Sequence, residues 1–60
     1  MNYLAQNIKY LRKEKGLTQE QLANKIGVKR AMVGAYEEGR AEPRLQTMQN
    51  ICYYFKIGLD

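Results

Sequence analysis

Two helix signals follow one another closely in residues 18–39, TQEQLANKIGVKRAMVGAYEEG, and they restrict the fold more than any other part of the chain. Thr18 is a favourable N-cap, and Gln21 three residues later completes the spacing of a capping box. Gly27 stands where this helix is expected to end, because glycine adopts the left-handed conformation at little steric cost. A short helix is therefore predicted between Thr18 and Gly27.

A second helix is predicted for about residues 29–37, directly after the turn at Gly27. Met32, Val33 and Tyr36 recur at helical spacing and are expected to face the core. The opposite face is expected to carry Arg30, Ala31, Gly34 and Ala35. A face of small residues with cations at its front end suits close approach to another molecule.

Two helices joined by a short turn that contains glycine form a helix-turn-helix, here at about residues 18–38. This arrangement typically seats its second helix in the major groove of DNA. Over about residues 7–60, the chain resembles the phage repressor and Cro family of DNA-binding proteins. The residues that carry the resemblance are Gly16, Leu17, Thr18, Gln19, Leu22, Ala23, Ile26, Gly27, Val28, Val33, Tyr36, Glu37, Gly39 and Pro43.

Two further helices are predicted on either side of this stretch. Leu4, Ile8 and Leu11 recur at the period of a helix packed on one side, which predicts a helix over about residues 2–15. A fourth helix is predicted for about residues 45–55, where the apolar stripe consists of Leu45, Met48, Ile51, Cys52 and Phe55. The expected fold is a compact all-α bundle of four helices plus the start of a fifth, of the lambda-repressor-like type.

Length and composition exclude several classes of protein. Sixty residues are expected to form one domain, cut from a longer protein after Asp60, and the net charge of +4 is compatible with a polyanionic partner. With no histidine and one cysteine, the chain lacks the residues of a zinc site or a disulfide framework. We expect no cofactor, no metal, no membrane span and no enzymatic activity, and a cytoplasmic location on the bacterial nucleoid.

Arg12 follows Ile8 by four residues and lies beside the apolar stripe of the first predicted helix. A freely solvated cation would be unexpected at such a position. In the family that the chain resembles, the matching arginine pairs with the glutamate that matches Glu37. The resemblance therefore implies a structural ion pair between Arg12 and Glu37, and the alternative is an ordinary surface arginine.

Base reading is expected on the second helix of the helix-turn-helix. Arg30 is the first candidate, because a guanidinium can donate two parallel hydrogen bonds to O6 and N7 of guanine. Ala31 and Ala35 offer methyl groups to thymine, and Gly34 can permit close approach. The expected base-reading set is Lys29, Arg30, Ala31, Gly34 and Ala35. The alternative for Arg30 is a solvated side chain or a phosphate contact.

Phosphate contacts are expected from cations and from helix N-termini. The resemblance implies that Gln19 matches the phosphate-contacting glutamine of the family, and that Arg40 and Arg44 match positions on the same DNA-facing edge. Glu38 and Glu42 lie near that edge in the sequence and would oppose binding where they face the DNA backbone.

The resemblance implies that the chain is the sequence-specific DNA-binding domain of a bacterial or phage transcriptional regulator, and that this regulator is a repressor. It would bind double-stranded DNA as a homodimer on a pseudo-palindromic operator. The tyrosines near the C-terminus are candidates for the contact between copies. The alternatives are an antitoxin that binds a toxin protein and represses its own operon, a protein-interaction module without DNA binding, and an enzymatic half after Asp60.

Overall fold

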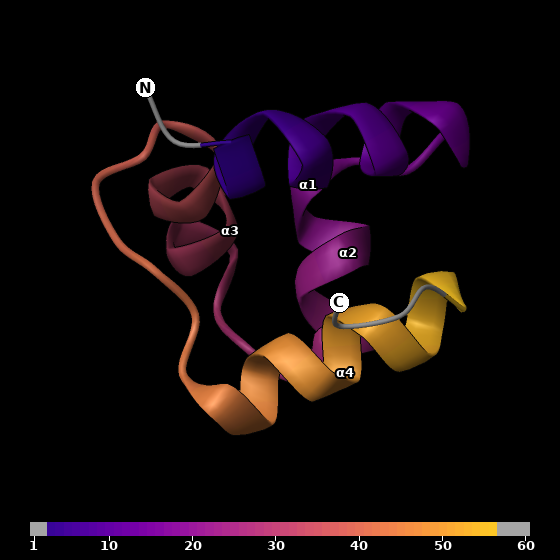
Figure 1. Ribbon diagram of the computed structural model, residues 1–60. Coiled ribbons are helices and arrows are strands. Elements are labelled where there is room, and N and C mark those ends of the chain that lie inside the picture. Colours follow the sequence, from indigo (N-terminus) through magenta and orange to yellow (C-terminus); the bar gives the residue numbers. More distant parts are fainter. Residues whose placement is uncertain (1–2, 57–60) are drawn as a thin grey trace.

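The computed structural model describes residues 3–56, which contain four helices and no strand (Figure 1). The helices are α1 (Tyr3–Glu14), α2 (Gln19–Ile26), α3 (Arg30–Glu37) and α4 (Leu45–Phe55). The prediction of an all-α bundle of four helices is confirmed. The predicted start of a fifth helix lies outside the described residues.

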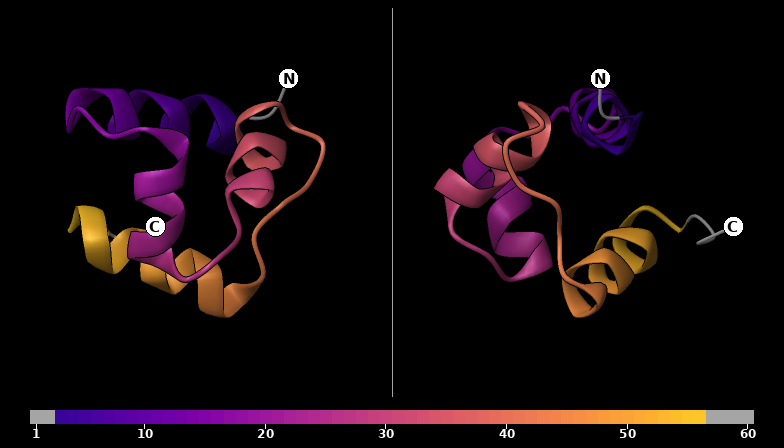
Figure 2. Two further views of the ribbon diagram at one scale, coloured as in Figure 1. Left: turned by 180° about the vertical axis from the view of Figure 1, so that it is seen from behind. Right: turned by 60° about the vertical axis from the view of Figure 1, so that its left-hand side comes forward.

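The helices are arranged around α2, which runs between α1 at one end of the molecule and α4 at the other (Figure 1). α3 packs against both α1 and α2, and α4 packs against α2. Residues 38–44 form a long connection that leads from the end of α3 along the outside of the molecule to the start of α4 (Figure 2). Among the helices of residues 3–56, none is long and apolar enough to cross a membrane.

α2 begins and ends at the residues that the sequence predicts. Thr18 Oγ1 accepts a hydrogen bond from the main-chain N–H of Gln21 at 3.0 Å, and Gln21 Oε1 accepts one from the N–H of Thr18 at 2.9 Å. Gly27 is left-handed, with a φ of 77°, and its N–H donates to the carbonyl of Ala23. These bonds satisfy main-chain N–H and C=O groups that have no hydrogen-bond partner within the helix. Neighbouring residues in the sequence therefore determine where α2 begins and ends.

The core lies where the four helices meet. Its most deeply buried side chains are Ile8, Leu22, Ile26, Val33 and Ile51. Each helix contributes at least one of them, and full burial of such a side chain is worth about 1.5–3 kcal/mol. The apolar stripe of each short helix is therefore covered only when all four are in place.

Two residues that were expected in the core lie at the surface. Leu45 is 70% exposed, because it opens α4, whose buried residues begin with Ile51. Met32 is also exposed, since the contacts of α3 with α1 and α2 cover Val33 and Tyr36 instead. The predictions for Leu45 and Met32 are therefore wrong, whereas Cys52 is buried as predicted.

Candidate nucleic-acid interface

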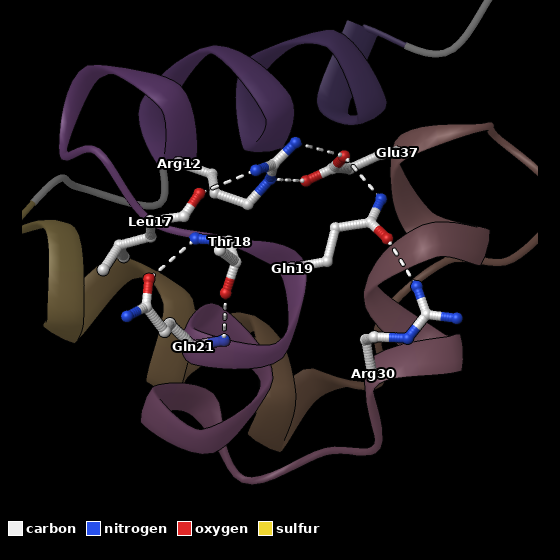
Figure 3. Close-up of polar contacts among 7 residues, drawn as sticks. All are labelled: Arg12, Leu17, Thr18, Gln19, Gln21, Arg30 and Glu37. Carbon is white, nitrogen blue, oxygen red and sulfur yellow. Dashed lines mark hydrogen bonds and ion pairs between the residues drawn. The ribbon is translucent and has the colours of Figure 1, made fainter.

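A largely buried ion pair joins α1 to the end of α3. Arg12 Nε lies 2.6 Å from Glu37 Oε2, and Arg12 Nη2 lies 3.2 Å from Glu37 Oε1, so the pair is bidentate (Figure 3). The side chains of Arg12 and Glu37 are only 11% and 3% exposed. Arg12 Nη1 also donates to the carbonyl of Leu17 at 2.7 Å, which ties the pair to the connection between α1 and α2. The ion pair that the resemblance implies is present.

Gln19, the first residue of α2, lies between Glu37 and Arg30 (Figure 3). Its Nε2 donates to Glu37 Oε1 at 3.1 Å, and its Oε1 accepts from Arg30 Nη1 at 2.9 Å. Hydrogen bonds therefore run without a break from Arg12 through Glu37 and Gln19 to Arg30. We call these four side chains the polar chain. It connects the ion pair at one end of α3 to the arginine at the other.

The exposed part of α3 is its N-terminal end. Lys29 is the N-cap of α3, and it is exposed together with Arg30 and Ala31. All three residues therefore have the exposure that base reading requires.

Gly34 and Ala35 do not belong to this exposed surface. Gly34 is buried, and a Cβ added there would lie 3.7 Å from Gln19 Oε1. Ala35 is only 6% exposed. The expectation that these two residues face outward is wrong, because α3 packs against two helices and its buried arc is wider than one stripe.

Lys29 and Arg44 bring positive charge to one cavity between α3 and α4. Each is the N-cap residue of its helix, and neither side chain caps that helix by a hydrogen bond. The cavity has a volume of about 350 Å³, and its other lining residues are Val28, Met32, Tyr36, Glu42 and Thr47. Because helix N-termini carry partial positive charge and unpaired N–H groups, two of them beside one cavity favour an anion there.

Arg40 lies on the connection after α3 and pairs with a neighbouring carboxylate. Its Nε lies 2.7 Å from Glu38 Oε1, and both side chains are exposed. An exposed ion pair contributes less than about 1 kcal/mol, so Arg40 can exchange this partner for another anion at small cost. Glu42 lines the same cavity as Lys29 and Arg44, so this edge is mixed in charge rather than uniformly basic.

The sequence gives the positions of the site residues but not the contacts among them. Gln19 and Arg30 are 11 residues apart, and only the packing of α2 against α3 brings their side chains together. Gln19 and Arg30 are each the first residue of a helix, and the two helices are consecutive. This is the feature of the sequence from which the contact could have been predicted. The shared cavity of Lys29 and Arg44 likewise requires the placement of α4 beside α3.

Comparisons with known proteins agree with this geometry. Residues 8–60 match the family model described as Helix-turn-helix. The chain is 41% identical over 56 residues to the uncharacterized HTH-type transcriptional regulator YqaE of Bacillus subtilis (strain 168), a match that covers 93% of the chain and 48% of YqaE.

Two further relatives have named activities. The cryptic phage CTXphi transcriptional repressor RstR of Vibrio cholerae is 38% identical over 50 residues, which cover 83% of the chain and 45% of RstR. The HTH-type transcriptional activator BcrR of Enterococcus faecalis is 33% identical over 55 residues, which cover 92% of the chain and 27% of BcrR. The matched region therefore spans less than half of the length of each of these relatives.

Proposed function

This chain belongs to the helix-turn-helix family, and we propose that it is the sequence-specific DNA-binding domain of a transcriptional regulator that acts on the nucleoid in the cytoplasm. The observation that carries the proposal is the exposed N-terminal end of α3, where Lys29, Arg30 and Ala31 lie together. In a helix-turn-helix, this end of the second helix contacts base edges in the major groove. Of the two activities named among the relatives, we propose repression, by occupation of an operator.

Arg30 is the proposed base-reading residue of this surface. Its guanidinium is exposed, and it retains donors beyond the one that it gives to Gln19. Two of them suffice to bind O6 and N7 of guanine. Lys29 and Ala31 flank this contact. Gly34 and Ala35 are left out of the proposed base-reading set, because they are buried.

Phosphate binding is proposed for the groups around this end of α3. Lys29 and Arg44 face one cavity, and Arg40 is bound only by an exposed ion pair. The N–H groups of Gln19 and Glu20, the first two residues of α2, are not used by the Thr18 cap and lie at a helix N-terminus, which favours an anion. Each phosphate neutralised is expected to add about 0.9 to the log–log slope of affinity against salt.

We further propose that two copies bind a pseudo-palindromic operator, with their α3 helices in successive major grooves about 34 Å apart. The support is the position of Tyr53, which is 87% exposed. It lines an open cavity of about 700 Å³ near the C-terminal end of α4. This end of α4 and α3 lie on opposite sides of the molecule (Figures 1 and 2). A contact between copies there would leave both α3 helices free for DNA.

Selection of bound sequences from a random pool of DNA duplexes, at two salt concentrations, tests the proposal. We expect the wild-type chain to enrich a two-fold symmetric site. Arg30→Ala is expected to relax one base position in each half-site, at a cost of about 1–3 kcal/mol in discrimination. Arg40→Ala is the matched control, and it should weaken all sequences equally and reduce the salt slope by about 0.9.

The selection also has an outcome that contradicts the proposal. If the wild-type chain enriches no sequence even at low salt, DNA reading is wrong for this domain. A protein partner, such as the toxin of an antitoxin pair, would then be the target to search for.

A further inference from the structure

Glu38 is an acidic residue at a helix end that does not favour one. It is the C-cap of α3, and the C-terminus of a helix carries partial negative charge, which stabilises cations there rather than carboxylates. Its side chain is 62% exposed, so burial does not explain its position either. Its side-chain partner among residues 3–56 is Arg40, whose Nε donates to Glu38 Oε1 at 2.7 Å. The effect of this carboxylate is therefore to be sought at Arg40.

The main chain keeps Glu38 and Arg40 side by side. The N–H of Glu38 donates to the carbonyl of Gly34 at 3.0 Å, and the N–H of Arg40 donates to the carbonyl of Ala35 at 2.9 Å. Between them, Gly39 is left-handed, with a φ of 76°. Because the segment is held on both sides of this turn, the carboxylate stays within reach of the guanidinium when another anion approaches. A partner tethered in this way has an effective concentration on the order of millimolar.

Glu42 is a second carboxylate placed among the groups proposed to bind phosphate. It lines the cavity of about 350 Å³ between α3 and α4, which Lys29 and Arg44 also line. Both cations are N-cap residues, so the cavity lies beside two helix N-termini, and this environment favours an anion. Glu42 supplies an anion from within the chain. A phosphate that enters the cavity therefore meets a negative charge that is already there.

We propose that Glu38 and Glu42 compete with DNA phosphates for the cations of this edge. Glu38 competes at Arg40. Glu42 competes at Lys29 and Arg44. This inference rests on the phosphate contacts of the function proposed above.

The consequence of this competition is a lower affinity of one copy for DNA of any sequence. A cation must exchange one anion for another, or bind a phosphate beside a carboxylate, so it stabilises the complex less than a cation without an acidic neighbour. Base discrimination by the N-terminal end of α3 is not affected, because the carboxylates act on phosphate contacts alone. Stable occupation of an operator then depends on a second copy, since two linked contacts bind more tightly than either alone.

Titration of fluorescently labelled duplexes, followed by anisotropy, tests the inference. The probes are one half of the site that the wild-type chain selects and a scrambled duplex of the same length and composition. Glu38→Gln and Glu42→Gln are each expected to raise the affinity about two- to fivefold, the range that corresponds to an exposed ion pair. The factor should be the same for both duplexes. It should shrink as the salt concentration rises, because salt screens exposed charges.

Glu14→Gln is the matched control, since it removes the same charge from another exposed glutamate. Glu14 is the last residue of α1, and this end of α1 extends away from α3 (Figures 1 and 2). At about 0.15 M salt, exposed charges more than about 8 Å apart are largely screened, so Glu14→Gln should leave both affinities unchanged. All three glutamates are exposed, so all three variants are expected to fold.

A double-mutant cycle with Arg40 tests the mechanism. In the Arg40→Ala background, Glu38→Gln should lose most of its effect, because the cation for which Glu38 competes is absent. Glu42→Gln should keep its effect in this background, since it acts on other cations. An equal effect of Glu38→Gln with and without Arg40 would indicate simple repulsion of phosphate and would overturn competition at Arg40.

The outcomes separate this inference from the proposed function. The inference is overturned for either carboxylate whose replacement leaves the affinity unchanged or lowers it; a loss in Glu38→Gln would mean that Glu38 holds Arg40 in place for phosphate. It is overturned as a whole if Glu14→Gln raises the affinity equally, because net charge would then be the cause. If the wild-type chain binds DNA but selects no sequence, the proposed function fails, and the affinities for the scrambled duplex still decide the inference. If it binds no duplex even at low salt, both fail.

Discussion

At the scale of single residues, the two ion pairs of the described chain have nearly the same shortest N···O distance but different surroundings. Arg12 and Glu37 approach to 2.6 Å, and Arg40 and Glu38 approach to 2.7 Å. The side chains of the first pair are 11% and 3% exposed, whereas those of the second are 63% and 62% exposed. Distance therefore does not distinguish the two pairs, but burial does. A buried charge that loses its partner keeps its desolvation penalty, and an exposed charge regains water.

Replacing each glutamate by alanine tests this difference. Glu37→Ala is expected to lower the free energy of unfolding by about 3–5 kcal/mol, because it leaves the Arg12 charge unpaired. Glu38→Ala, at the neighbouring position, is expected to cost less than about 1 kcal/mol. Urea denaturation followed by circular dichroism measures both values. Similar losses for the two variants would contradict the role assigned to burial.

At the scale of helices, most boundaries could be predicted because the signals that set them are local. Thr18 and Gln21 cap α2 within three residues, and Gly27 ends it by its own conformation. α4 occupies the predicted residues 45–55. The buried face of α3 could not be predicted equally well. Residues 33–36 are all buried, because α1 and α2 cover α3 from two directions, whereas a periodicity argument assumes one.

The site could be predicted only in part, because local sequence signals set some of its features and the packing of helices sets the others. Exposure of Arg30 and Ala31 follows from local position, and the ion pair between Arg12 and Glu37 was implied by the resemblance. The placement of Gln19 between Arg30 and Glu37 depends on how two helices pack. Side-chain contacts of this kind are set by tertiary geometry, which the sequence spacing of single residues does not contain.

Two glycines provide a test at the scale of helices. Gly34 lies within α3, where an added Cβ would make ordinary contact with Gln19 at 3.7 Å, and Gly27 is left-handed with open space around it. Gly34→Ala is expected to raise the free energy of unfolding by up to about 1 kcal/mol, since alanine favours the helix. Gly27→Ala is expected to lower it by about 1–2 kcal/mol, because of left-handed strain alone. Chemical denaturation of both variants measures the two effects. Loss of stability in Gly34→Ala would mean that Gln19 has no room for the added methyl group.

At the scale of the whole molecule, the two proposed surfaces face away from each other. The end of α3 that would read DNA and the end of α4 that carries Tyr53 lie on opposite sides (Figures 1 and 2). A contact between copies at Tyr53 would therefore leave both α3 helices uncovered. Two half-sites one helical turn apart require two such helices, related by a two-fold axis and about 34 Å apart.

Replacing Tyr53 tests this arrangement. Tyr53→Ser is expected to weaken association of two copies on the selected duplex, while the base preference within each half-site stays the same. Sedimentation of the protein with a whole operator and with a half-site measures both properties. Tyr10→Ser is the matched control, because Tyr10 is also an exposed tyrosine but lies on α1. Equal effects of the two replacements would contradict a contact at Tyr53.

The ion pair between Arg12 and Glu37 also has a kinetic consequence, since it joins residues 25 apart in the chain. α2 and α3 are joined by a short turn, so their contacts close a smaller loop and are expected to form first. An interaction that forms after the rate-limiting step of folding affects the unfolding rate more than the folding rate. Arg12→Lys, which loses the bidentate geometry, is therefore expected to speed unfolding in stopped-flow experiments and to leave the folding rate near that of the wild type. Slower folding with unchanged unfolding would contradict this order of events. The pair then governs how long the domain stays folded once it has formed.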